Sequence, residues 1–241
     1  MSKVVAIFGA GSGLGVALGR RFGREGFKVA LVARRAEKLR ALEAELAAEG
    51  IEAASFPADL SDPAAGREAV AAIRARFGRI DVVSYQPLPG GTTFTPAADL
   101  DAEQLRKLMD LFVLTPVEIA HEVIPELRER GDGAFFVTGG FTAADPQPFI
   151  SGLGPAMSAI RNYVFSLHGE VADAGVYAAV VTLTALITGS EAHESMTAEQ
   201  LSAVAGKGIG TLDNDTLADT YWDLYVRRDR VEYLFPEPTS A

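Results

Sequence analysis

The residues of this chain best placed to do chemistry are three glycines in the segment "IFGAGSGLGVALG". Gly9, Gly13 and Gly15 follow the spacing GxxxGxG and lie between a short apolar run and an amphipathic stretch. Glycines there permit a tight strand-to-helix turn and let the backbone approach a pyrophosphate, whose charge the helix N-terminus stabilises. The loop predicts a dinucleotide site formed by Gly9, Ser12, Gly13, Leu14 and Gly15. A tight turn that binds nothing is the alternative.

The end of the second apolar run indicates which dinucleotide is bound. An NAD site usually has an Asp or Glu about 20 residues further on, which holds the ribose 2′-hydroxyl. Here "LVARRAEKL" has Ala33 at about that place, followed by Arg34 and Arg35. A guanidinium pairs with a 2′-phosphate, so NADP(H) is favoured over NAD(H), unless the arginines are merely solvated. In "ADL", Asp59 and Leu60 are expected beside the adenine, although Asp59 would serve equally as a turn or capping residue.

The segment 139–157, "GGFTAADPQPFISGLGPAM", lies where a chain of this type would normally carry its acid–base chemistry. It contains no Lys, Tyr, His or Cys. A positioned acid or base contributes about 10²–10⁴ in rate, so a replacement is needed for proton transfer. The candidates are Tyr85, Thr142, Ser151 and His193, each of which can also be read as a packing, turn or surface residue. No His or Cys spacing suggests a metal site, and "GAGSG" has Gly where a nucleophile elbow requires Ser.

The composition and net charge of the chain limit its fold class and the kinds of partner that it can have. The chain has 241 residues, of which 48% are hydrophobic, and this suits one large α/β domain with a substantial core. The formal net charge of −10 disfavours nucleic acid as a partner, because nucleic acid requires a basic face. There is no cysteine, and no apolar run approaches the roughly 20 residues of a membrane span. The N-terminus does not read as a signal peptide, so we expect a cytoplasmic protein with no membrane partner.

Apolar runs alternate with amphipathic stretches along the chain. The expected strands are 3–9, 28–33, 51–58, 80–85, 133–139, 176–186 and 231–235. The expected helices are 13–25, 36–50, 63–77, one or two within 100–130, 155–174 and 217–228. Strands that are apolar throughout and separated by helices imply a parallel sheet covered on both faces. We expect one doubly wound α/β domain over residues 1–241, with the polar segment 190–210 as a mobile cover over the substrate.

Glycine spacing, strand rhythm and length together resemble the short-chain dehydrogenase/reductase family. The resemblance covers nearly the whole chain, from Lys3 to about Thr188, and is looser beyond. It implies a Rossmann domain with a mostly parallel, seven-stranded sheet and helices on both faces. It also implies NAD(P)(H) as cofactor, reduction of carbonyls or oxidation of alcohols, and a homodimer or homotetramer.

The cofactor side of the family pattern is largely present. The glycine loop matches, although Phe8 stands where a Thr usually precedes it, and Asp59–Leu60 match the Asp–aliphatic pair of the family. Tyr85 ends the fourth strand, beside the expected place of the nicotinamide ribose. Thr188 lies where the family has a Thr near the nicotinamide and phosphates.

The catalytic side of the family pattern is not present. The family has an Asn on the long helix, a Ser after the fifth strand, and a Tyr followed one helical turn later by a Lys. Phe112, Gly140, Leu153 and Met157 occupy these four positions, and "SYQPLPG" replaces the Asn–Asn–Ala–Gly signature. Leu153 and Met157 donate no proton and make the pocket wall apolar, so the usual family mechanism is not available.

Two functions remain open. The first is an atypical NADP(H)-dependent oxidoreductase that acts on an unidentified, apolar small molecule without the Tyr–Lys pair. The second is a non-redox protein of the same fold, either a ligand-binding pseudoenzyme or a cyclase or isomerase that uses the same cleft. We favour the first, because the glycine loop and Arg34 are intact.

Overall fold

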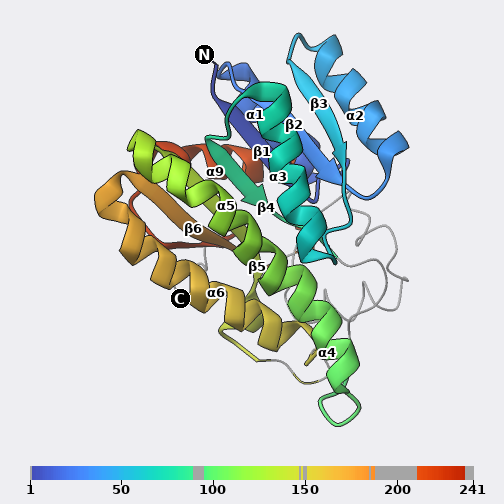
Figure 1. Cartoon of the computed structure of the whole chain (residues 1–241). Helices are drawn as coiled ribbons and strands as arrows, with labels where there is room; N and C mark the ends of the chain where they lie inside the picture. The colour runs from blue at the N-terminus through green and yellow to red at the C-terminus, as the bar shows by residue number, and fades with distance from the viewer. Residues whose placement is uncertain are drawn as a thin grey trace.

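Seven parallel strands form one sheet in the order β3-β2-β1-β4-β5-β6-β9 (Figure 1). The structure is a computed structural model that describes residues 2–88, 95–146, 148, 151–184, 186–187 and 211–236. The strands are β1 (Val4–Phe8), β2 (Lys28–Ala33), β3 (Ala53–Pro57), β4 (Val82–Tyr85), β5 (Gly133–Gly140), β6 (Val176–Leu183) and β9 (Glu232–Phe235). The expected doubly wound α/β fold is confirmed, with a central sheet that is parallel throughout.

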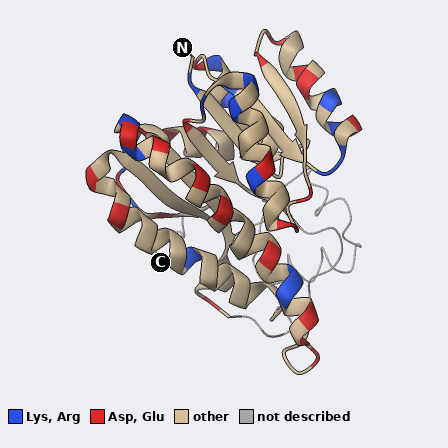
Figure 2. Ribbon diagram, in the orientation of Figure 1, with Lys and Arg blue, Asp and Glu red and all other residues tan. Residues whose placement is uncertain are grey.

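Helices cover both faces of this sheet (Figure 1). On one face lie α1 (Leu14–Arg24), α2 (Ala36–Ala48) and α9 (Asn214–Arg227), and on the other α3 (Pro63–Phe77), α5 (Thr115–Arg130) and α6 (Leu153–Val171). The short helix α4 (Ala102–Met109) precedes α5. Figure 2 shows Lys and Arg interspersed with Asp and Glu along the outer helices, while the strands are almost free of charge. None of the helices in the described ranges is long and apolar enough to cross a membrane.

Successive side chains of β1 point to opposite faces of the sheet and pack into two different apolar clusters. Val4, Ala6 and Phe8 belong to the cluster under α3, α5 and α6, whereas Val5 and Ile7 belong to the cluster under α1, α2 and α9. All five side chains are fully buried. Because helices cover both faces, each central strand reads as an unbroken apolar run, which is why the strands were recognisable from the sequence.

Apart from ends that are shifted by one to three residues, the structure differs from the sequence expectations at two places. The stretch 100–130 is neither one regular helix nor two separate ones, because a π-helical turn, Asp110–Leu114, joins α4 to α5. The sixth strand ends at Leu183, and β7 (Leu186–Ile187) instead pairs with β8 (Thr211–Leu212) in a separate two-stranded sheet. Strands of two residues are too short to show periodicity. The predicted cover, 190–210, lies outside the described residues.

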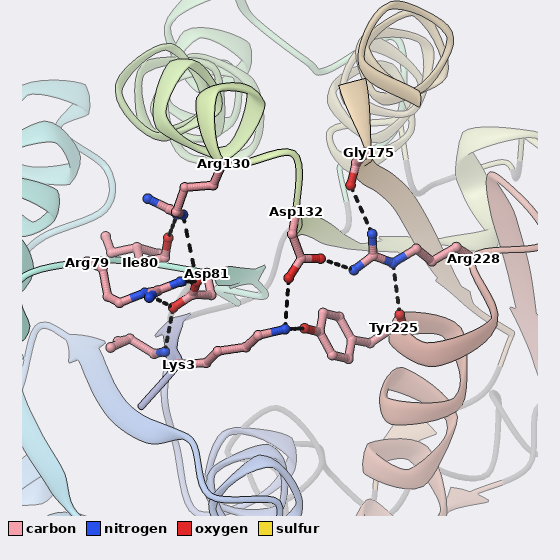
Figure 3. A network of polar contacts seen from close by, with 10 residues as sticks. Lys3, Arg79, Ile80, Asp81, Arg130, Asp132, Gly175, Tyr225 and Arg228 are labelled. Atoms are coloured by element: carbon pink, nitrogen blue, oxygen red, sulfur yellow. Dashed lines mark hydrogen bonds and ion pairs between the residues drawn. The ribbon is translucent and has the colours of Figure 1, made fainter. Parts of the chain in front are cut away.

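A buried carboxylate organises the amino-terminal edge of the sheet (Figure 3). Asp81 directly precedes β4 and is 1% exposed. It accepts a hydrogen bond from the backbone N–H of Val4 at 2.8 Å and another from Arg79 Nε at 2.8 Å. Its own backbone N–H donates to the Val4 carbonyl at 2.9 Å. One side chain thus fixes where β1 and β4 begin.

A second carboxylate at the same edge connects β5 to α9 (Figure 3). Asp132 lies 2.8 Å from Lys3 Nζ and 2.6 Å from the Arg228 guanidinium, and Lys3 also donates to the Tyr225 hydroxyl at 2.7 Å. Burial alone would raise the pKa of Asp132, but the hydrogen bonds from Lys3 and Arg228 outweigh it and lower the pKa. Lys3, Asp81 and Asp132 all precede parallel strands, so this network lies at the edge opposite the glycine loop.

Candidate active site

The glycine loop begins at the carboxyl end of β1, next to the ends of β2 and β4. Gly9 has a φ of 90°, in the left-handed region, and a Cβ there would lie 2.5 Å from the backbone nitrogen of Pro87. The N–H groups of Gly9 and Ala10 donate to the Val32 carbonyl at 2.8 and 3.0 Å. The first glycine is therefore required both by its backbone conformation and by close packing.

Two further glycines determine how α1 starts. Gly13 is its N-cap residue and brings no side-chain cap, and a Cβ at Gly15 would lie 2.8 Å from the Cα of Ala10. Ser12 is exposed, while Leu14 is buried beneath the turn. The first N–H groups of a helix have no acceptor within the helix, and its N-terminus carries a partial positive charge. A glycine-rich backbone at the N-terminus of a helix fits a pyrophosphate.

The arginines and the aspartate predicted to hold the adenosine end lie beside this loop. Arg34 and Arg35 follow β2 and are exposed, and Arg35 is the N-cap residue of α2. Asp59 follows β3 and accepts hydrogen bonds from Ser61, at 2.7 Å from Oγ and 3.1 Å from the backbone N–H. These bonds lower the pKa of Asp59, and the positive charge of Arg34 adds to the effect. Leu60 is buried. Arg34 and Asp59 are therefore neighbours at the carboxyl edge, with Asp59 also forming a turn.

Tyr85 does not direct its hydroxyl toward a ligand. The side chain is 1% exposed, and the hydroxyl donates a hydrogen bond to the backbone carbonyl of Leu111. Burial raises the pKa of Tyr85 far above its ordinary value. The next residue, Gln86, is also buried and accepts a hydrogen bond from Ser84 at 3.2 Å. The geometry thus favours the alternative reading of Tyr85 as a packing residue.

Three of the four positions where the family pattern has catalytic residues form an apolar wall. Phe112 in the π turn is 4% exposed and Met157 on α6 is 7% exposed, and both belong to one apolar cluster. Leu153, the first residue of α6, is partly buried and packs against that cluster. The π turn contacts α6 directly. We use the term apolar wall for Phe112, Leu153 and Met157.

The fourth position, Gly140, ends β5 and has a hydroxyl group nearby. Its backbone is extended, with φ −123° and ψ 153°, and the nearest atom to an added Cβ is Thr142 Oγ1 at 3.9 Å. Thr142 lies in the short 3₁₀ turn Phe141–Ala143 and is 6% exposed. Ser151 is half-buried, and its backbone N–H donates to the Thr95 carbonyl at 3.1 Å. Of the predicted hydroxyl candidates, Thr142 is thus the one next to the Gly140 position.

Two predicted site residues, Thr188 and His193, lie outside the described residues. One residue that the sequence reasoning missed is Thr115, which is fully buried and donates its hydroxyl hydrogen to the Leu60 carbonyl at 2.8 Å. A threonine directly before a proline near the start of a helix was its only signal. Within the described ranges, no group of three or more His, Asp or Glu side chains is arranged to hold a metal ion.

Comparisons with known proteins consistently find dehydrogenases and other oxidoreductases. A model of the short chain dehydrogenase family matches residues 3–199. Serine 3-dehydrogenase of Agrobacterium fabrum is 29% identical over 227 residues, which cover 92% of this chain and 88% of that protein. The 1-deoxy-11-beta-hydroxypentalenate dehydrogenase of Streptomyces arenae is 31% identical over 173 residues, or 72% of this chain. The chain spans only 58% of that relative, and 56% of a short chain dehydrogenase of Pseudocercospora fijiensis.

Solved structures agree in fold. A metagenomic short-chain oxidoreductase in complex with NADP has a TM-score of 0.79 at 23% identity, covering 97% of both chains. An NADPH-bound short chain oxidoreductase from Pseudomonas aeruginosa, described as containing an atypical catalytic center, has a TM-score of 0.83 at 20% identity. That match covers 99% of this chain and 98% of the other. At these identities the likeness shows the arrangement of the backbone and nothing more.

Proposed function

This chain belongs to the short-chain dehydrogenase family, and from that premise we propose that it is an NADP(H)-dependent oxidoreductase with a non-standard active site. Its substrate would be an apolar small molecule. The observation that carries the proposal is the glycine loop, where Gly9 and Gly15 leave no room for a Cβ next to the N-terminus of α1. The names of the relatives, which are dehydrogenases, support the same reaction class.

We propose that the loop and its neighbours hold the cofactor in the following way. The backbone of Gly9 to Gly15 binds the pyrophosphate, Arg34 and Arg35 bind the 2′-phosphate, and Asp59–Leu60 contact the adenine. Thr188 would contact the nicotinamide end. The NADP bound to the metagenomic oxidoreductase and the NADPH bound to the Pseudomonas aeruginosa oxidoreductase support NADP(H) over NAD(H).

The apolar wall determines what this chain's own residues contribute to the reaction. Bound NADPH supplies a hydride. Phe112, Leu153 and Met157 exclude water and orient an apolar substrate, and Thr142 is the hydroxyl best placed to hydrogen-bond its polar atom. A threonine hydroxyl donates a hydrogen bond without readily giving up its proton. The site therefore suits an acceptor that needs little acid catalysis, such as an iminium or an activated alkene.

A second candidate function rests on the same apolar wall. With no ionisable group at the positions of Phe112, Gly140, Leu153 and Met157, the cleft would also suit a non-redox role, as a ligand-binding pseudoenzyme or as a cyclase or isomerase. NADPH deuterated at C4 separates the two functions. Stereospecific loss of the label in the presence of an accepted substrate supports the oxidoreductase, and binding without loss for every acceptor supports the alternative.

The cofactor proposal is tested by titrating the purified protein with NADPH and NADH. We expect Arg34→Ala to weaken NADPH binding by roughly tenfold and to leave NADH binding nearly unchanged, because only NADPH carries the 2′-phosphate. Arg40→Ala, at an exposed arginine further along α2, is the matched control and should change neither. Absence of binding to both nucleotides would remove the oxidoreductase proposal.

We also propose a homodimer or homotetramer in the cytoplasm, with no nucleic-acid or membrane partner. On α6, Met157, Ile160, Val164 and Leu167 are buried in the core of this chain, whereas Phe165 is half-buried and Leu114, just before α5, is 45% exposed, and these two side chains would suit a partner surface. Sedimentation velocity at micromolar concentration decides the subunit number, and a single monomeric species would contradict the proposal.

A further inference from the structure

The π turn between α4 and α5 changes which donors can reach the Leu111 backbone carbonyl. In a regular helix the Leu111 carbonyl would accept from the N–H of Thr115. Here the Thr115 N–H donates to the Asp110 carbonyl instead, which is the five-residue spacing of a π turn. At the same spacing the donor to Leu111 would be residue 116, which is Pro116 and has no N–H.

The hydroxyl of Tyr85 supplies the missing donor. It reaches the Leu111 carbonyl from the end of β4, and the side chain is 1% exposed, so water does not compete freely for that carbonyl. Thr115 anchors the same turn through its own bond to the Leu60 carbonyl, after β3. Two hydroxyls therefore tie the turn to the carboxyl ends of two strands.

The residue that follows Leu111 is Phe112, which forms part of the apolar wall. Phe112, Tyr85 and Met157 belong to the same apolar cluster, and the turn contacts α6. A change in the conformation of the turn would therefore move Phe112 relative to Met157. We propose that Tyr85 is a positioning residue, whose hydroxyl replaces the donor that Pro116 lacks and so holds Phe112 in the wall before a ligand binds. The part of this inference that concerns a ligand rests on the proposed function.

A double-mutant cycle on the full chain tests the inference. Tyr85→Phe removes only the hydroxyl, and Pro116→Ala returns an N–H at residue 116. We expect Tyr85→Phe alone to speed amide hydrogen exchange in a peptide spanning residues 108–118 by roughly tenfold, because a buried carbonyl loses its partner. When Pro116→Ala is already present, Tyr85→Phe should speed exchange less than about twofold.

The matched control is Tyr177→Phe. Tyr177 is 2% exposed and its hydroxyl also donates to a backbone carbonyl, that of Arg230, at 2.6 Å. Loss of the Tyr177 hydroxyl should leave amide hydrogen exchange in the 108–118 peptide unchanged, whether residue 116 is Pro or Ala. An equal effect of Tyr85→Phe with and without Pro116→Ala, or no effect at all, would overturn the inference.

A spectroscopic readout separates positioning from a purely structural role. With NADPH at saturation, the nicotinamide emission of Tyr85→Phe should shift toward that of free NADPH and return in the double variant, while Kd stays within about twofold, because the phosphate loop is untouched. Unchanged emission alongside faster exchange would overturn the positioning role. If the unmodified protein binds no NADPH, the proposed function fails, and the exchange experiment still decides whether Tyr85 holds the turn.

Discussion

Met157 illustrates how individual residues set the polarity of the site. The resemblance to the family implies a Lys at its position, whereas the Met157 side chain is 7% exposed and lies in the same apolar cluster as Phe112. An ammonium group placed there would have no hydroxyl partner from Leu153 or Gly140. Returning the lysine alone would therefore bury an unpaired charge and would not rebuild a catalytic pair.

We expect Met157→Lys to lower the free energy of unfolding by about 3 kcal/mol, because the charge must be either buried or neutralised. Met157→Leu, which nearly conserves volume, should cost less than about 1.5 kcal/mol. Urea denaturation monitored by circular dichroism measures both. Equal stability of the lysine variant and the unmodified protein would show that position 157 is open to water.

Part of the site could be predicted residue by residue. The glycines could be, because a strand-to-helix turn that allows no Cβ has a local signature at Gly9 and Gly15. The role of Tyr85 could not be, because its partner is a carbonyl 26 positions away that becomes free only through a π turn and a proline. Sequence patterns describe helices as regular, and an extra residue in a helical turn leaves no periodic trace.

Among the elements, β9 is attached to the rest of the fold by its backbone pairing with β6 and by one carboxylate, that of Glu232. Glu232 accepts two hydrogen bonds from Arg161 on α6, at 2.9 and 2.6 Å, and one from the Thr182 hydroxyl on β6 at 2.7 Å. The bonds from Arg161 lower the pKa of Glu232 below its ordinary value of 4.5. Glu232 thus joins the last strand to both α6 and the neighbouring strand β6.

Stability should therefore depend on pH through Glu232. Because the pKa of Glu232 is lower in the folded than in the unfolded state, its contribution is complete above about pH 4.5 and is lost as the pH falls through the folded pKa. Glu232→Gln should lower the free energy of unfolding by about 1–2 kcal/mol at pH 7 and flatten its decline in acid.

Urea titrations from pH 3 to pH 7, roughly the span of carboxyl titration, measure this effect. Glu129→Gln, at an exposed position of α5, is the control and should leave the pH dependence as it is. Parallel curves for Glu232→Gln and the unmodified protein would contradict the argument.

Element types were predictable because every central strand is buried on both faces and every helix has an apolar face. The larger differences occur where periodicity is absent, namely at the π turn and at the short pair β7 and β8, while other ends are shifted by one to three residues.

At the scale of the whole molecule, the stabilising network and the proposed binding site lie at opposite edges of one sheet. Asp81 and Asp132 stabilise the amino-terminal edge (Figure 3), while the glycine loop, Arg34 and the apolar wall lie at the carboxyl edge. Substitutions at the carboxyl edge should therefore leave the amino-terminal network intact.

We expect Asp81→Asn to lower the free energy of unfolding by about 3 kcal/mol, because Arg79 loses its buried partner. NADPH affinity, measured well below the unfolding temperature, should stay within about twofold. Arg34→Ala should weaken NADPH binding and leave the free energy of unfolding nearly unchanged. A large loss of affinity in Asp81→Asn would show that the two edges are coupled.

The strand order β3-β2-β1-β4-β5-β6-β9 has a consequence for synthesis on the ribosome. β4 is added beside β1, and each strand translated after β4 is added outside the one before it, so from β4 onward the newest strand forms an edge of the growing sheet. For β6 that strand is apolar and nearly all buried in the finished protein, and it acquires its neighbour only when Glu232–Phe235 emerge. Until then the nascent chain exposes an apolar strand with an unpaired edge, and its need for a chaperone is greatest during this interval.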